Sequence, residues 1–96
     1  MSDIKRINVG KRMSDAAVHN GVVYLAGQVA DTPTKDVRGQ TAEVLATIDR
    51  LLAEAGSDKT RMLQVQIFLS DISNFAAMNE VWDAWVPQGA TPPRAT

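Results

Sequence analysis

The sequence contains no cysteine and a single histidine, His19. The missing cysteines exclude disulfides, cysteine-ligated zinc sites and thiol nucleophiles, and one histidine excludes metal ligation by several histidines of this chain. A serine nucleophile needs a base within reach, and no second histidine is available to serve as one. Because His19 falls on a predicted strand beside a turn, we interpret it as a structural residue that is exposed or hydrogen-bonded.

Long apolar runs and a charge excess of either sign are also absent. No stretch approaches the roughly 20 apolar residues that span a bilayer, and the N-terminus lacks the apolar stretch of a signal peptide, so the sequence predicts a cytoplasmic protein without membrane partners. The formal net charge is -1, which gives no general affinity for a polyanion. Nucleic acid is therefore not an expected partner.

The chain is 96 residues long, with 45% hydrophobic and 22% charged residues. This length and composition are typical of one soluble domain, which we expect to cover residues 1–96. The predicted order is strand, hairpin, helix, strand, helix. Because each helix has one apolar face, the order indicates an α+β fold with both helices on the same side of a sheet.

The strongest local signal is a hairpin around Asn20 and Gly21. Strands are predicted at 16–19 and 22–29, and both turn residues tolerate the positive φ that a type I′ turn requires. Residues 4–9 are predicted to form an edge strand. Gly27 interrupts the second hairpin strand, which indicates a bulge or a close approach by other atoms to its bare backbone.

A first helix is expected between Asp36, as N-cap, and Gly56, just beyond the C-terminal end. Its apolar residues recur at steps of 3 and 4 and form one buried stripe: Leu45, Ile48, Leu52 and Ala55.

Alternation of apolar and other residues then predicts a half-buried strand at 63–70. Ser73 is expected to cap a second helix that stops before Pro87. This helix carries an aromatic stripe that we interpret as core packing rather than as a cofactor site: Phe75, Met78, Trp82 and Trp85.

Arg94 follows Pro93 in the last ten residues, which contain three prolines. An arginine that emerges from a stiffened segment can be aimed with little loss of entropy, and its planar fork fits a carboxylate. An arginine in a flexible tail, however, is more often inert. These residues alone leave the function undecided.

Five short motifs together resemble the RidA (YjgF/YER057c/UK114) family. They are AGQV at 26–29, AEAG at 53–56, IFLSD at 67–71, FAAMN at 75–79 and PPRAT at 92–96. Their order and spacing match the family along nearly the whole chain. The resemblance implies a chorismate-mutase-like α+β fold with an antiparallel or mixed sheet, assembled as a homotrimer with a ligand cleft at each subunit interface.

The resemblance also implies an activity: hydrolysis of reactive enamine or imine intermediates, such as 2-imino acids, to 2-oxo acids and ammonia. The resemblance implies that this reaction uses no metal or cofactor. At the positions that match the family's site, Arg94 is expected to bind the substrate carboxylate, Gly27 to line the cleft and Asn79 to neighbour the site. Met13 stands where many members have tyrosine, with Ser14 following it, so a hydroxyl contact is lost or replaced.

Family members usually continue beyond this arginine through one or two further strands that carry a glutamate proposed to hold the hydrolytic water. The sequence given ends at Thr96, and we expect a domain without those strands. Two alternatives to the deaminase remain open at this point. One is a non-catalytic module that binds small carboxylates in the same cleft, and the other is an endoribonuclease or translation inhibitor, as older family names suggest.

Overall fold

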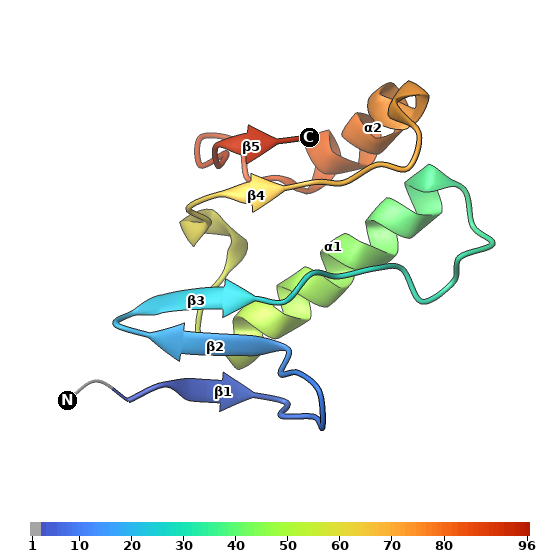
Figure 1. Cartoon of the computed structure of the whole chain (residues 1–96). Coiled ribbons are helices and arrows are strands. Elements are labelled where there is room, and N and C mark those ends of the chain that lie inside the picture. Colours follow the sequence, from blue (N-terminus) through green and yellow to red (C-terminus); the bar gives the residue numbers. More distant parts are fainter. Residues whose placement is uncertain (1–2) are drawn as a thin grey trace.

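The computed structural model describes residues 3–96 (Figure 1). The strands are β1 (Lys5–Ile7), β2 (Ala16–His19), β3 (Val22–Leu25), β4 (Val65–Gln66) and β5 (Arg94–Ala95). The helices are α1 (Val37–Glu54) and α2 (Phe75–Trp85), with short 3-10 turns at Lys59–Arg61 and Ile72–Asn74. Within these residues β1, β2 and β3 form an antiparallel sheet, whereas β4 and β5 form a separate parallel pair.

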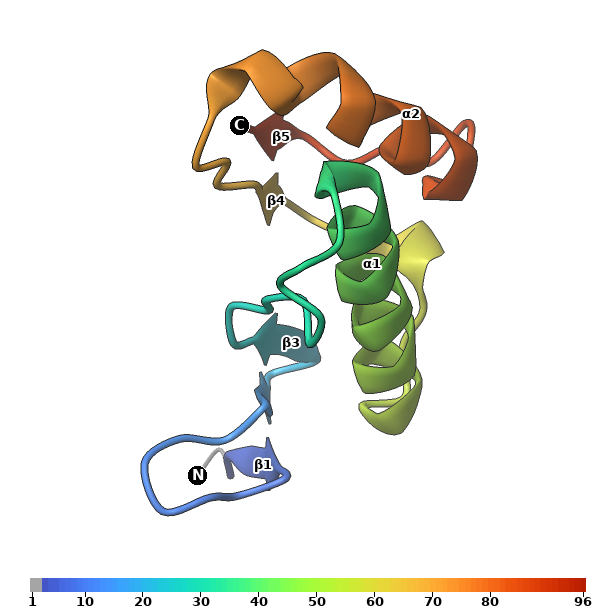
Figure 2. The ribbon, with the colours of Figure 1, turned by 90° about the vertical axis from the view of Figure 1, so that its right-hand side faces the viewer.

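The strands and helices form two layers. In Figure 2 the strands are seen nearly end-on as one column, and α1 lies on one side of it, with α2 crossing the end of the column towards that same side. The α+β prediction, with antiparallel and parallel strands and with the helices on one side, is therefore confirmed. Among residues 3–96, no helix combines the length and the apolar character that crossing a membrane requires.

The hairpin is formed as predicted. Asn20 and Gly21 adopt φ values of 51° and 77°, the left-handed conformation at both central positions that a type I′ turn needs. The register places Ala16 opposite Leu25, and β1 pairs with the other edge of β2. The predicted edge strand is thus present, although it is shorter than 4–9.

The second hairpin strand ends earlier than predicted, at Leu25 rather than at residue 29. The cause is the loss of its partner, because the last bond across the ladder runs from the amide of Ala26 to the carbonyl of Asp15. Before Asp15 the neighbouring chain turns away into the β1–β2 loop. Gly27 consequently lies beyond the strand and not inside it.

Helix α1 has the ends that the sequence predicts. The Asp36 carboxylate accepts the amide of Gly39 at 2.9 Å, a cap of the kind that contributes about 1 kcal/mol to stability. At the other end Gly56 has φ +80°, and the amide of Ser57 donates to the carbonyl of Leu52 at 2.8 Å. This pattern is a Schellman motif, in which glycine supplies the left-handed residue.

The strand predicted at 63–70 is reduced to Val65–Gln66. Its ladder is short because its partner β5 contains only Arg94 and Ala95, bounded by a proline that cannot donate a hydrogen bond. The amide of Val65 donates to the carbonyl of Pro93, and the amide of Ile67 to that of Ala95. The chain after Pro93 is therefore a paired strand and not a free tail.

Helix α2 spans the predicted residues, but its predicted cap is wrong. Asp71 accepts the amide of Ser73 at 2.9 Å and so caps the 3-10 turn that precedes the helix. Ser73 is the donor in this arrangement, and its hydroxyl does not cap α2. Asn74, at the N-cap position of α2, makes no capping bond with its side chain.

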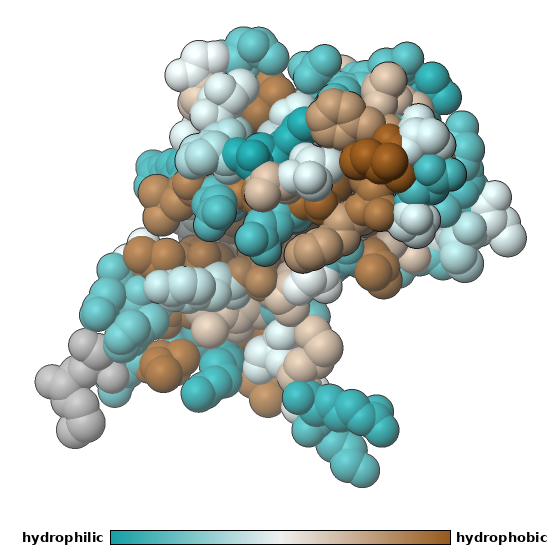
Figure 3. Space-filling model, turned by 45° about the horizontal axis from the view of Figure 1, so that its top comes forward, coloured by the Kyte–Doolittle hydropathy of each residue, from teal (hydrophilic) through white to brown (hydrophobic). Residues whose placement is uncertain are grey.

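The principal core lies where α1, α2 and β4 meet. Its buried residues are Leu45, Met78, Trp82 and Val86. Partly buried residues that pack against them include Val65, Ile67 and Leu69, so the alternation predicted along this segment is confirmed for these three. Leu63, expected on the same face, is 71% exposed. Figure 3 shows further apolar surface among polar residues in the upper half of the molecule, which contains α2, β4 and β5.

Candidate functional site

Arg94 is held against α2 by a side-chain hydrogen bond. Its Nη1 donates to Oδ1 of Asn79 at 2.8 Å, and its side chain is half-buried. The pairing of β5 with β4 fixes the backbone of Arg94, because Val65 lies opposite it in the parallel ladder. The structure thus brings together two of the site residues predicted from the sequence.

Two aromatic rings flank the guanidinium. Its central carbon lies 5.2 Å from the ring centroid of Trp82 and 5.7 Å from that of Phe75, both within cation–π range. Phe75, Asn79 and Trp82 are four and three residues apart on α2, a spacing that places them on the same helix face. One helix face therefore supplies all three side chains that contact Arg94.

No carboxylate of residues 3–96 lies within ion-pair distance of Arg94. Asn79 takes one N–H of a guanidinium that carries about five donors. A half-buried cation without an internal counter-charge favours an external anion, and the planar fork fits a carboxylate with two parallel bonds. This geometry makes Arg94 the strongest candidate for an anion-binding residue.

The other predicted site residues have no contact with Arg94 within this chain. Gly27 is exposed, and a Cβ placed on it would meet no atom within 4 Å, so these residues provide no close approach that requires a glycine. Met13 is 57% exposed and Ser14 is half-buried, both in the β1–β2 loop. Figure 1 shows this loop at the opposite end of the molecule from β5.

Neither a metal cluster nor a histidine-based site is present in residues 3–96. No group of three or more potential side-chain ligands from His, Asp or Glu comes together there. His19 is half-buried on β2, and its Nδ1 is buried without a hydrogen-bond partner. The interpretation of His19 as exposed or hydrogen-bonded is therefore wrong for Nδ1.

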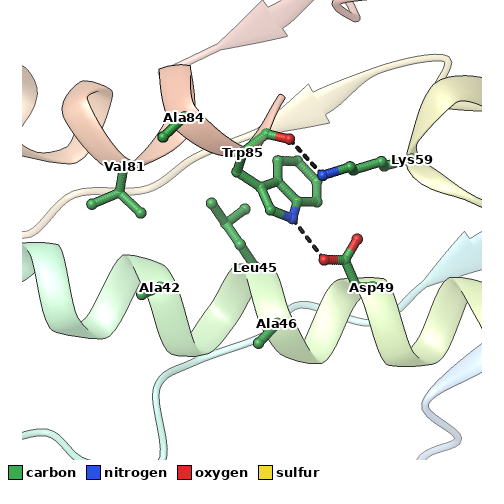
Figure 4. Close-up of a pocket in the computed structure, with 8 residues that line it drawn as sticks. All are labelled: Ala42, Leu45, Ala46, Asp49, Lys59, Val81, Ala84 and Trp85. Atoms are coloured by element: carbon green, nitrogen blue, oxygen red, sulfur yellow. Dashed lines mark hydrogen bonds between the residues drawn. The ribbon is translucent and has the colours of Figure 1, made fainter. Parts of the chain in front are cut away.

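A groove of about 310 Å³ lies between the two helices, away from Arg94 (Figure 4). Its polar groups are already paired: the indole of Trp85 donates to Asp49 at 2.8 Å, and Lys59 Nζ donates to the carbonyl of Trp85 at 2.7 Å. The remaining lining is Ala42, Leu45, Ala46, Val81 and Ala84. The paired groups join α1, α2 and the Lys59–Arg61 turn, which is a structural role.

Phe75 and Trp82 are the site residues that sequence reasoning missed, because their helical spacing was attributed to core packing alone. Trp82 is indeed buried in the core, but Phe75 is 41% exposed. The signal that could have identified them is their position on the same helix face as Asn79. The bond between Asn79 and Arg94, however, depends on tertiary structure.

Comparison with known proteins identifies the family. The model described as endoribonuclease L-PSP matches residues 3–96. RutC family proteins from Haemophilus influenzae and from Escherichia coli K12 are each 45% identical to this chain and cover 97% of it and 81% of their own length. The chain belongs to the RidA/YjgF family.

Solved structures agree with this membership. A YjgF family member from Neisseria meningitidis is 47% identical, with a TM-score of 0.94 over 97% of this chain and 77% of its own. A Rid family protein from Yersinia pestis is 26% identical, with a TM-score of 0.91 over 98% and 84% of the two chains. The RidA-family fold inferred from five short motifs is therefore confirmed.

Proposed function

We propose that this RidA-family chain hydrolyses 2-imino acids, and the enamines in equilibrium with them, to 2-oxo acids and ammonia. The single observation that carries the proposal is the setting of Arg94: half-buried, bonded to Asn79 and without a carboxylate partner in residues 3–96. Such a guanidinium is suited to the carboxylate of a small acid. Family membership supports the choice of an imine as the reacting group.

The reaction needs little beyond binding and access to water. Water adds to the imine carbon, the C=N electron pair moves to nitrogen and is protonated, and the resulting carbinolamine expels ammonia to leave the 2-oxo acid. The carbon is already electrophilic, so fixing the carboxylate with Arg94 converts the encounter with water into an oriented attack. An enamine enters the same path after protonation at carbon.

The second half of the proposed site comes from another copy of the chain. Gly27, Met13 and Ser14 carry no contact to Arg94 within one chain, and the bare surface around Gly27 leaves room for an approaching group. We propose that they face the Arg94 of a neighbouring subunit in a homotrimer. Sedimentation equilibrium is expected to give three times the 10.4 kDa of one chain, and a monomer at micromolar concentration would contradict this arrangement.

The decisive experiment follows the disappearance of a freshly generated 2-imino acid, together with ammonia release. We expect wild type to accelerate hydrolysis and Arg94→Ala to lose at least about 100-fold in kcat/KM, as expected when a charged hydrogen-bonding partner worth about 3 kcal/mol is removed. Arg61→Ala is the matched control, because Arg61 is an exposed arginine whose weak ion pair with Asp58 spans 3.6 Å. Equal acceleration by wild type and Arg94→Ala would remove Arg94 from the mechanism.

A second candidate function is carboxylate binding without turnover. It is favoured by the contacts of Arg94 in residues 3–96, because an amide and two aromatic rings cannot act as a base for the attacking water. A small 2-oxo acid that binds while the imine decays at its uncatalysed rate would select this candidate over the deaminase.

Endoribonuclease activity is suggested by the description of the matching family model. The net charge of -1 and the single histidine give it little support, because single-stranded RNA is usually held by a basic groove with stacking aromatics. Failure to bind or cleave single-stranded RNA at low salt would dismiss it.

A further inference from the structure

The two rings beside Arg94 differ in burial although both contact the same guanidinium. Trp82 is 6% exposed and belongs to the core, whereas Phe75 is 41% exposed and stands at the surface. Their centroids lie 5.2 and 5.7 Å from the guanidinium carbon. Phe75 can therefore be changed without opening the core, which makes its contribution to the site measurable.

We propose that Trp82 and Phe75 are positioning residues, which orient the Arg94 guanidinium for a carboxylate and make the site require arginine. The proposal rests on the proposed function, since it concerns the same anion-binding residue. Asn79 fixes one N–H of the guanidinium, and the two rings limit where its plane can lie. The four other N–H donors have no partner in residues 3–96.

The physical reason lies in the chemistry of guanidinium. It is planar and weakly hydrated, so it can rest against aromatic faces and still present its N–H edge to a carboxylate. An ammonium group is compact and strongly hydrated and cannot reproduce this arrangement. Orienting the side chain before binding also reduces the rotamer entropy that is lost when the ligand binds.

Phe75→Leu tests the exposed ring directly. The probe is 2-oxobutanoate, a stable small 2-oxo acid, titrated by calorimetry. A cation–π contact at an exposed site contributes about 0.5–1 kcal/mol, so we expect Phe75→Leu to weaken binding by about 2- to 5-fold. Phe75→Tyr retains an aromatic face and should bind within about 2-fold of wild type.

Phe68→Leu is the matched control, because Phe68 is 89% exposed and makes no ring contact with Arg94. We expect its affinity for the probe to equal that of wild type. Arg94→Lys is expected to bind the probe at least about 10-fold more weakly than wild type, because the positive charge is kept but the fork is lost.

Fluorescence gives a readout that a purely structural role would not change. In Trp85→Phe the only remaining tryptophan is Trp82, so its emission reports on the guanidinium beside it. We expect 2-oxobutanoate to change this emission, and the change to disappear in the Trp85→Phe/Arg94→Lys double variant.

The outcomes separate this inference from the proposed function. The positioning role is wrong, and the proposed function stands, if Phe75→Leu binds the probe as well as wild type does and if 2-oxobutanoate leaves the Trp82 emission of Trp85→Phe unchanged. If wild type neither binds the probe nor hydrolyses the imine, both are overturned. If affinity falls in Phe75→Leu and is restored in Phe75→Tyr, the positioning role is supported.

Discussion

The two groups of candidate site residues differ in what this chain provides for them. Arg94 and Asn79 are bonded to each other, and two rings flank the guanidinium. Gly27 and Met13 lie in exposed loops near the antiparallel sheet, where the surface around Gly27 is open. One chain therefore holds the Arg94 group of candidate residues in place and leaves the Gly27 group on open surface.

The β1–β2 loop shows that free surface is not the same as lack of order. Within it the amide of Gly10 donates to the carbonyl of Met13 at 2.8 Å. Asn8 Nδ2 lies 3.0 Å from carboxylate oxygens of both Asp15 and Glu54. These bonds hold the loop backbone while the Met13 side chain points into solvent. The difference between the two groups is thus one of side-chain partners and not of backbone structure.

The largest expected difference in stability is between substitutions of two methionines, one from the core and one from the group of candidate residues near the antiparallel sheet. Met78 is 1% exposed in the core beside Trp82, and Met13 is 57% exposed. We expect Met78→Ala to lower the free energy of unfolding by about 2–5 kcal/mol and Met13→Ala to change it by less than about 0.5 kcal/mol. Urea denaturation measures both. A loss at Met13 as large as that at Met78 would mean that its side chain is covered in solution.

A smaller effect is expected from two glycines of the antiparallel half. Gly21 has φ +77°, so Gly21→Ala should lower the free energy of unfolding by about 1–2 kcal/mol. Gly27 has no positive φ, and a Cβ added to it would meet no atom within 4 Å. Gly27→Ala should therefore leave stability unchanged or raise it by up to about 1 kcal/mol.

The same Gly27→Ala variant tests whether the open surface is functional. If a substrate or a second subunit approaches the bare backbone, 2-oxobutanoate binding should fall while thermal stability of the fold is kept. If Gly27→Ala changed neither the binding of 2-oxobutanoate nor the assembly of the chain, Gly27 would not belong to a functional site.

The smallest effect concerns the loop after β3 and depends on pH. The Glu43 carboxylate accepts a hydrogen bond from the Lys35 ammonium at 2.7 Å and another from the backbone amide of Thr32 at 3.0 Å. The hydrogen bond from Lys35, followed by that from Thr32, lowers the pKa of Glu43 from 4.5 to about 2. A carboxyl group with a depressed pKa in the folded state stabilises the fold above its unfolded pKa.

This stabilisation is therefore fully present above about pH 4.5 and is lost as the pH falls towards 2. We expect Glu43→Gln to be less stable than wild type at neutral pH and to lose less stability over that interval. Thermal midpoints measured between pH 2 and 7 test this. If the thermal midpoints of the two proteins fell by the same amount over this pH range, the Glu43 carboxylate would not stabilise the loop.

Local signals predicted the elements well wherever a few adjacent residues determine the backbone. The Asn20-Gly21 turn, the Asp36 cap and the Gly56 end of α1 depend on conformational preferences and bonds within a few residues. The strand limits at Leu25 and Gln66 could not be predicted in this way. They depend on where the pairing with a neighbouring strand ends, which is at Asp15 in one case and at Ala95 in the other.

The candidate site divides along the same line. The sequence by itself determined the hairpin, the ends of α1, the extent of α2 and, through its motifs, the family, because these follow from local conformation and recurring residue order. Only the tertiary structure decided that Arg94 meets Asn79, Phe75 and Trp82, since β5 must first pair with β4 before residues 12 to 19 positions apart in the chain can touch.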